Sequence, residues 1–261
     1  DLENDLAVSL NDSGDALAAL PHAERALALT DQSRNSPLDR AVVIMNLAST
    51  FENAGDYVRA ESLMREGVAL YMAHSVPEAK DRLRAEGNHA RVLGLLGRFD
   101  AARAVFESVR RRHEQGDGER GWPWAFESVR QAQMERRAGR LADALALLDA
   151  AEPTFAAALP EHHPALAQPL RIRGQVALAQ GRIEDARHAF DQAAALIGDE
   201  GLAFDRAIVA CEQAAVALAR GDRGTATALL GKHLPILRSA TLPGEVNRKD
   251  AEALVRRLAL D

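Results

Sequence analysis

Residues 97–110 read GRFDAARAVFESVR, and this stretch returns along the chain with little change. It begins again as GRLADALALLDAAE at Gly139 and as GRIEDARHAFDQAA at Gly181. Three further copies, spaced so that successive glycines are 40–42 residues apart, begin at Gly14, Gly55 and Gly221. A fixed period of roughly 20–50 residues is typical of repeat proteins, in which each repeat is one supersecondary unit.

Within each copy, the spacing of apolar residues predicts a helix that begins just after the glycine. An alanine follows the glycine by five residues in every copy, at Ala19, Ala60, Ala102, Ala144, Ala186 and Ala226. A large apolar residue follows four positions later in most copies, at Met64, Phe106, Leu148, Phe190 and Leu230. Residues three and four apart share a helix face, and glycine accepts the left-handed backbone that ends a preceding helix. Each copy therefore predicts the turn and second helix of a helical hairpin, with the alanine at the closest helix approach.

A first helix is predicted upstream of each glycine. Residues 38–53, for example, carry apolar residues on one face, at Ile44, Leu47, Ala48 and Phe51. Prolines stand where first helices should begin, a position that needs no backbone N–H, at Pro37, Pro77, Pro123 and Pro164. We therefore predict one α-solenoid domain over residues 1–261, made of six antiparallel helix pairs, with residues 244–261 as a C-terminal capping helix.

Composition agrees with an all-α fold and excludes other classes. Aromatic residues make up only 4% of the chain and hydrophobic residues 47%, and no apolar run is long enough to span a membrane. The single Cys211 can form neither an intrachain disulfide nor a cysteine metal cluster. It fits a reducing compartment, so a cytoplasmic location is predicted. The alanine excess and the preference for arginine over lysine favour a bacterial source, and the start at Asp1 favours a segment of a longer protein.

The repeated pattern resembles the tetratricopeptide repeat, which places glycine, an aromatic, alanine and a second aromatic at this spacing. Tyr57, Phe99, Leu141 and Ile183 occupy the first large position. The usual repeat has about 34 residues, whereas these lengths are similar to the kinesin-light-chain-like class. Residues 160–170, PEHHPALAQPL, resemble the His-Pro start of that class's first helix. Three copies depart from the pattern, at Ala23, Gly67 and Arg223. The resemblance implies a right-handed superhelix whose concave face is lined by the first helices.

Carrying the family's groove positions onto the first helices gives a set of candidate peptide-binding residues. They are Asn46, Ser49, Asn53, Arg84, Asn88, Arg91, Phe126, Arg130, Gln133, Arg137, Arg171 and Gln175, with Val42, Met45 and Gln168 on the same faces. Within each helix these positions recur every three or four residues, so they share one face independently of the resemblance. The predicted face is polar, and in the middle of the chain it is basic.

Charge is distributed unevenly along the chain. The whole protein has a net charge of −6, yet residues 77–140 hold 14 basic and 10 acidic residues. Arginine side chains bind carboxylates through paired hydrogen bonds, and amide side chains can hold a peptide backbone. We therefore predict an acidic peptide or protein segment as the ligand of the groove. The alternative is that these arginines form a solvated face paired with Glu and Asp.

Other functions find little support in the sequence. A net negative chain without a dominant basic patch does not predict a nucleic-acid partner. Neither a nucleophile elbow nor a phosphate-binding loop is present, so we predict no enzyme, no cofactor and no catalytic residue. His162 and His163 are adjacent and point in different directions, so no metal site is expected. For Trp122 and Trp124, packing of a long loop is favoured over stacking on a ligand.

Two readings of function therefore remain open. The first is a non-enzymatic scaffold that binds a peptide or protein in its concave groove. The second is a regulatory or sensory region of a larger bacterial signalling protein, such as a kinase or a transcription regulator. Membrane insertion of this segment is not expected. The oligomeric state is left open, because the divergent terminal copies could also mediate self-assembly.

Overall fold

In the computed structural model, the described residues are 2–32, 36–117 and 120–260. Within these ranges the chain forms α-helices, one short 3-10 turn and no strand. The helices are α1 (Leu2–Asp12), α2 (Ala16–Gln32), α3 (Pro37–Ala54), α4 (Tyr57–His74), α5 (Lys80–Leu95), α6 (Phe99–Asp117), α7 (Trp122–Arg137), α8 (Leu141–Ala158), α9 (Ala167–Ala179), α10 (Ile183–Ile197), α11 (Ala203–Ala219), α12 (Arg223–Ala240) and α13 (Val246–Leu260), with the 3-10 turn at Pro164–Leu166. Asp1 and Asp261, at the ends of the predicted domain, lie outside the described residues.

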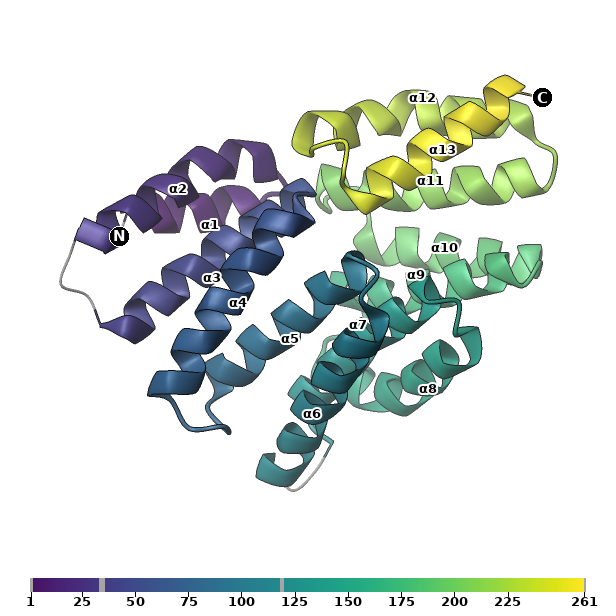
Figure 1. Ribbon diagram of the computed structural model, residues 1–261. Coiled ribbons are helices and arrows are strands. Elements are labelled where there is room, and N and C mark those ends of the chain that lie inside the picture. The colour runs from purple at the N-terminus through teal and green to yellow at the C-terminus, as the bar shows by residue number, and fades with distance from the viewer. Residues whose placement is uncertain (1, 33–35, 118–119, 261) are drawn as a thin grey trace.

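Consecutive helices form antiparallel pairs that stack side by side into an all-α solenoid, as Figure 1 shows. The six glycines between paired helices all have positive φ angles, from 75° to 94°. The six alanines that follow them by five residues are all 0% exposed. The repeated glycine and alanine thus play the structural parts predicted for them, a left-handed turn and a close helix crossing.

Large side chains fill the space between the close crossings. Phe106, Phe155 and Phe190 are among the largest fully buried residues, together with Met64 and Leu148. The predicted apolar face of α3 is also buried, since Ile44, Leu47, Ala48 and Phe51 are at most 4% exposed. Each pair therefore buries one stripe of each helix, and stacking supplies a core that runs along the array.

Two of the four prolines do not stand where they were predicted. Pro37 and Pro123 lie in the first turns of α3 and α7. Pro77 instead lies in the loop before α5, which begins only at Lys80. Pro164 opens the 3-10 turn that precedes α9. Each of these prolines therefore lies at or shortly before the start of a first helix, but its position does not determine the residue at which that helix begins.

The array curves until its two ends meet, as Figure 1 shows for α2 and α12. The backbone N–H of Leu242, between α12 and α13, donates to the carbonyl of Ala54 at 2.7 Å. The N–H of Val246, at the start of α13, donates to the Tyr57 hydroxyl at 2.9 Å. Residues from the second helix pair and the C-terminal segment are therefore in direct contact, and they enclose the middle of the concave face.

Candidate functional site

A cavity of about 360 Å³ lies where the array closes on itself. The C-terminal halves of α3, α5, α7 and the facing part of α9 supply one wall, and the start of α11 and the α12–α13 segment supply the other. Six of the predicted groove residues line it, namely Asn53, Arg91, Gln133, Arg137, Arg171 and Gln175, and Gln168 lies with them. The structure thus brings together half of the predicted site from four separate helices.

Several predicted groove residues are hydrogen-bonded to the equivalent residue of the neighbouring pair. The Asn46 amide donates to Asn4 at 2.9 Å, and the Asn53 amide donates to Asn11 at 3.1 Å. Arg130 donates to the Asn88 side chain at 2.7 Å. In all three bonds the partners are 42 residues apart, one repeat length. These side chains form a ladder that connects adjacent first helices, so part of their hydrogen-bonding capacity is used within the fold.

Four of the five predicted arginines have a carboxylate partner. Arg84 lies 3.0 Å from Asp81, Arg91 lies 2.7 Å from Glu52, and Arg130 lies 3.1 Å from Glu127. Arg171 holds Glu212 through two hydrogen bonds of 2.9 Å, and Gln175 donates to the same carboxylate. Burial raises the pKa of the Glu52 carboxyl, and the nearby Arg91 opposes that shift. Four of the five arginines are therefore ion-paired, but Arg130 is buried, so these pairs do not form the wholly solvated face of the alternative prediction.

Arg137 differs from the other predicted arginines. Within the described ranges, neither Arg137 nor its neighbour Arg136 has a carboxylate at ion-pair distance, and the buried Nε of each lacks a hydrogen-bond partner. Burial, together with the charge of the adjacent Arg137, lowers the pKa of Arg136 to about 10. Burial likewise lowers the pKa of Arg137. Two guanidinium groups at the end of α7 are thus partly desolvated without the paired anion that normally compensates such burial.

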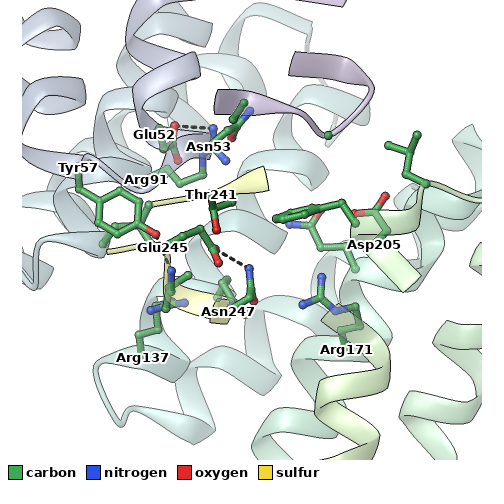
Figure 2. A pocket seen from close by; sticks show the side chains of 18 of the residues that line it. Glu52, Asn53, Tyr57, Arg91, Arg137, Arg171, Asp205, Thr241, Glu245 and Asn247 are labelled. Carbon is green, nitrogen blue, oxygen red and sulfur yellow. Dashed lines mark hydrogen bonds and ion pairs between the residues drawn. The ribbon is translucent and has the colours of Figure 1, made fainter. Parts of the chain in front are cut away.

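The opposite wall presents acidic and amide groups from the C-terminal segment. Glu245 is only 5% exposed, and its carboxylate accepts hydrogen bonds from the Asn247 amide at 2.8 Å and the Arg248 N–H at 2.7 Å. Figure 2 shows Glu245 and Asn247 in the middle of the cavity, between Arg137 and Arg171. Burial raises the pKa of the Tyr57 hydroxyl, and the charge of Glu245 raises it further. The cavity therefore holds charges of both signs, and Arg137 faces Glu245 without pairing to it.

The remaining predicted residues lie away from this cavity. Arg84 and Phe126 line a separate cavity between the start of α5, the end of α6 and the start of α7. Asn46, Ser49, Asn88 and Arg130 do not line the central cavity. Trp122 lies 4.6 Å from the Phe155 ring, and Trp124 is 4% exposed. Both tryptophans lie in the first turn of α7, and Trp122 packs against Phe155 of α8. Whether they also pack the preceding loop stays a prediction, because Gly118 and Glu119 lie outside the described residues.

Sequence reasoning missed the other half of the cavity. The repeat pattern predicts Tyr57 in hairpin packing, and it predicts Glu245 and Asn247 at the start of the capping helix. No local pattern connects these residues, because they meet the groove only through a contact that spans most of the chain.

Residues 2–32, 36–117 and 120–260 contain no candidate metal site and no helix suited to cross a membrane. No three histidine, cysteine, aspartate or glutamate side chains gather there in a way that could hold a metal ion. None of the helices in these ranges combines the length and apolar character needed to cross a bilayer.

Comparison with known proteins relates the fold to repeat proteins. No protein-family model matches the sequence, and no curated protein matches it either. Among solved structures, a Rap protein complexed with Competence and Sporulation Factor matches over 97% of this chain and 72% of its own, with a TM-score of 0.72 and 14% identity.

Two further structures support the same conclusion. The Rap conjugation gene regulator of plasmid pLS20, in complex with a Phr peptide, matches over 97% of this chain and 73% of its own, with a TM-score of 0.67 and 12% identity. BtubC (BKLC) from P. vanneervenii matches over 87% of this chain and 90% of its own, with a TM-score of 0.58 and 21% identity. The predicted all-α solenoid with a TPR-like helical-repeat fold is confirmed.

Proposed function

We propose that this chain is a non-enzymatic scaffold that binds a peptide or protein segment in the concave cavity. Arg137 carries the proposal, because it is the predicted groove arginine that faces the cavity without a carboxylate partner among the described residues. A ligand carboxylate placed there gains a charge-assisted hydrogen bond and relieves an uncompensated buried charge. The preferred ligand is therefore a segment that carries at least one Asp or Glu.

The polar lining supports an extended peptide as the ligand. Gln133 and Gln175 each have a buried side-chain oxygen without a hydrogen-bond partner, and both line the cavity with Arg137. Amide oxygens accept hydrogen bonds from peptide N–H groups, so these residues can hold a backbone while Arg137 holds a side chain. Two of the similar structures, both Rap proteins, are complexes with Competence and Sporulation Factor and with a Phr peptide.

The test is selection of blocked acidic peptides against the wild-type chain, followed by affinity measurement with two charge-reversal variants. Arg137→Glu removes the proposed anchor, whereas Arg84→Glu makes the same charge change on an exposed residue outside the cavity. Loss of a hydrogen bond between charged groups should weaken binding about tenfold or more for Arg137→Glu. Binding by Arg84→Glu should stay within about twofold, the range of surface substitutions. Equal losses in both variants, or no selected peptide, would contradict the proposal.

A regulatory role for the same array is the second candidate. One similar structure is described as a conjugation gene regulator, and the closed array here has a contact between distant repeats that a ligand could bias. Ligand binding would then change curvature and be read by an attached domain. Small-angle scattering with and without a selected peptide tests this role, which requires a measurable change in the radius of gyration.

A further inference from the structure

The segment Thr241–Asn247 reaches across the concave face from the C-terminal end of the array. Two of its backbone N–H groups donate to the second helix pair, from Leu242 to the Ala54 carbonyl and from Val246 to the Tyr57 hydroxyl. Thr241, Glu245, Val246 and Asn247 also line the central cavity. The segment is therefore both a wall of the cavity and the connection that closes the array.

Two glycines make this contact close. A Cβ added to Gly244 would lie 2.6 Å from the carbonyl oxygen of Gly55, and one added to Gly55 would lie 2.4 Å from the Glu245 nitrogen. Neither distance is compatible with normal van der Waals contact. Backbone thus lies directly against backbone, which leaves no room for side chains to interlock.

Little apolar surface holds the segment in place. Thr241 and Glu245 are buried, but both are polar. Pro243 and Gly244 are exposed, and Leu242 and Val246 are only partly buried. Elements held by few apolar contacts and by a small number of hydrogen bonds open at low free-energy cost. The hydrogen bonds of Glu245 come from Asn247 and from Arg248 in the first turn of α13, and neither bond involves the second helix pair.

From this contact we propose that Thr241–Asn247 is a releasable latch that closes the array over its central cavity and holds the Glu245 carboxylate opposite Arg137, where a ligand carboxylate would otherwise bind. The identity of the ligand that enters when the latch opens rests on the proposed peptide-binding function. The opening of the latch does not depend on that function. Release exposes Arg137 and the amides around it, and an incoming acidic segment replaces Glu245. In the absence of a ligand, Glu245 of the same chain therefore occupies the place of the ligand carboxylate in the cavity.

The first test measures opening without any ligand, by hydrogen exchange at the Leu242 and Val246 amides. Gly244→Ala should unseat the latch, while Gly231→Ala on α12 is the matched control, because a Cβ at Gly231 meets nothing within 4 Å. Weakening a contact of this kind by one hydrogen bond should speed exchange at both amides about tenfold. Circular dichroism establishes that both variants retain their helices. Equal exchange in Gly244→Ala and the control would overturn the latch.

A second measurement reports on the cavity itself. A cysteine placed in the lining by Gln133→Cys is labelled with a maleimide reagent, with and without Gly244→Ala. Burial raises the pKa of the native Cys211 thiol to about 12, so this residue contributes little background. Labelling should be about tenfold faster in the unlatched background, in line with a tenfold larger open population. An exposed Ala146→Cys on α8 should react at the same rate in both backgrounds.

The two proposals can fail separately. Selected acidic peptides should bind Gly244→Ala more tightly than the wild type and Gly231→Ala, because they no longer compete with Glu245. If exchange and labelling accelerate but no acidic peptide binds either form, the latch stands and the proposed function fails. If peptides bind all three forms equally and exchange is unchanged, the binding function stands and the latch fails.

Discussion

The alanine that follows each helix-ending glycine sets how closely two helices of a pair can approach. All six are completely buried, and each belongs to the second helix of its pair. Gly67 also marks a close approach of two helices, because a Cβ there would lie 2.7 Å from the Met45 sulfur. Small residues at these crossings therefore determine the packing distance of the whole array.

The crossing in the fourth pair offers a direct test. Ala144→Leu places extra methyl groups in a fully packed site on α8, whereas Ala146→Leu makes the same change on the exposed face of that helix. Overpacking should lower the free energy of unfolding by about 1–3 kcal/mol for Ala144→Leu, and the control should change it by less than about 0.5 kcal/mol. Urea unfolding followed by circular dichroism measures both values. Similar stabilities of the two variants would show that position 144 is not a tight crossing.

At the scale of elements, Glu135 connects α6, α7 and the turn that follows. It is 1% exposed, and it accepts two hydrogen bonds of 2.8 Å from Arg103 as well as one from Arg140. Burial alone would raise the pKa of the Glu135 carboxyl. The hydrogen bonds from Arg103 and Arg140 outweigh that effect, so the pKa is lowered. The carboxylate therefore stabilises the junction only while it is ionised.

Glu135→Gln is expected to destabilise the protein by about 1.5–3 kcal/mol at neutral pH, because it removes the buried charged acceptor of Arg103 and Arg140 while Arg103 keeps Asp143 at 3.1 Å. The native pKa is lowered, so the stabilisation is fully present above the unfolded value of about 4.3 and is lost as the pH falls through the folded value. The difference between wild type and variant should shrink accordingly. Urea titrations from about pH 7 to about pH 3 test this sign. A difference independent of pH would contradict the role of the charge.

Helix pairs were predictable from the sequence because their signals are local. The glycines, alanines and apolar stripes lie within one repeat, and the structure confirms them at Gly97, Ala102 and Phe106. The site was predictable only in part. Arg91 and Arg171 line the central cavity, and their partners Glu52 and Glu212 come from neighbouring first helices. Which arginine stays unpaired depends on contacts that no single repeat encodes.

At the scale of the whole molecule, closure joins residues that no periodicity relates. Tyr57 and Val246 are 189 positions apart and share a hydrogen bond. Gly55 and Gly244 are apposed in the same contact. The repeat spacing predicts which residues of adjacent helix pairs are neighbours. Closure depends instead on how much the array curves over all of its helix pairs together. The sequence therefore predicted the array and not its closed form.

A double-mutant cycle tests whether the two glycines act through one contact. Gly55→Ala and Gly244→Ala each disrupt the closure, so the second substitution should cost less in the presence of the first. The coupling energy in urea unfolding should be about 0.5–3 kcal/mol. Gly97 is the control for Gly55, because it has a positive φ and a Cβ there meets nothing within 4 Å. Gly97→Ala combined with Gly244→Ala should be additive within about 0.5 kcal/mol.

Closure also constrains how such a chain can change its length. An open solenoid can gain or lose a repeat by duplication or deletion, since each unit contacts only its neighbours. Here the Gly55 turn must meet Gly244, and inserting one unit of 42 residues between them would carry the two ends past each other. The side-chain ladder would accept the extra unit, because its bonds follow the 42-residue spacing. The contact therefore restricts how many repeats can lie between Gly55 and Gly244.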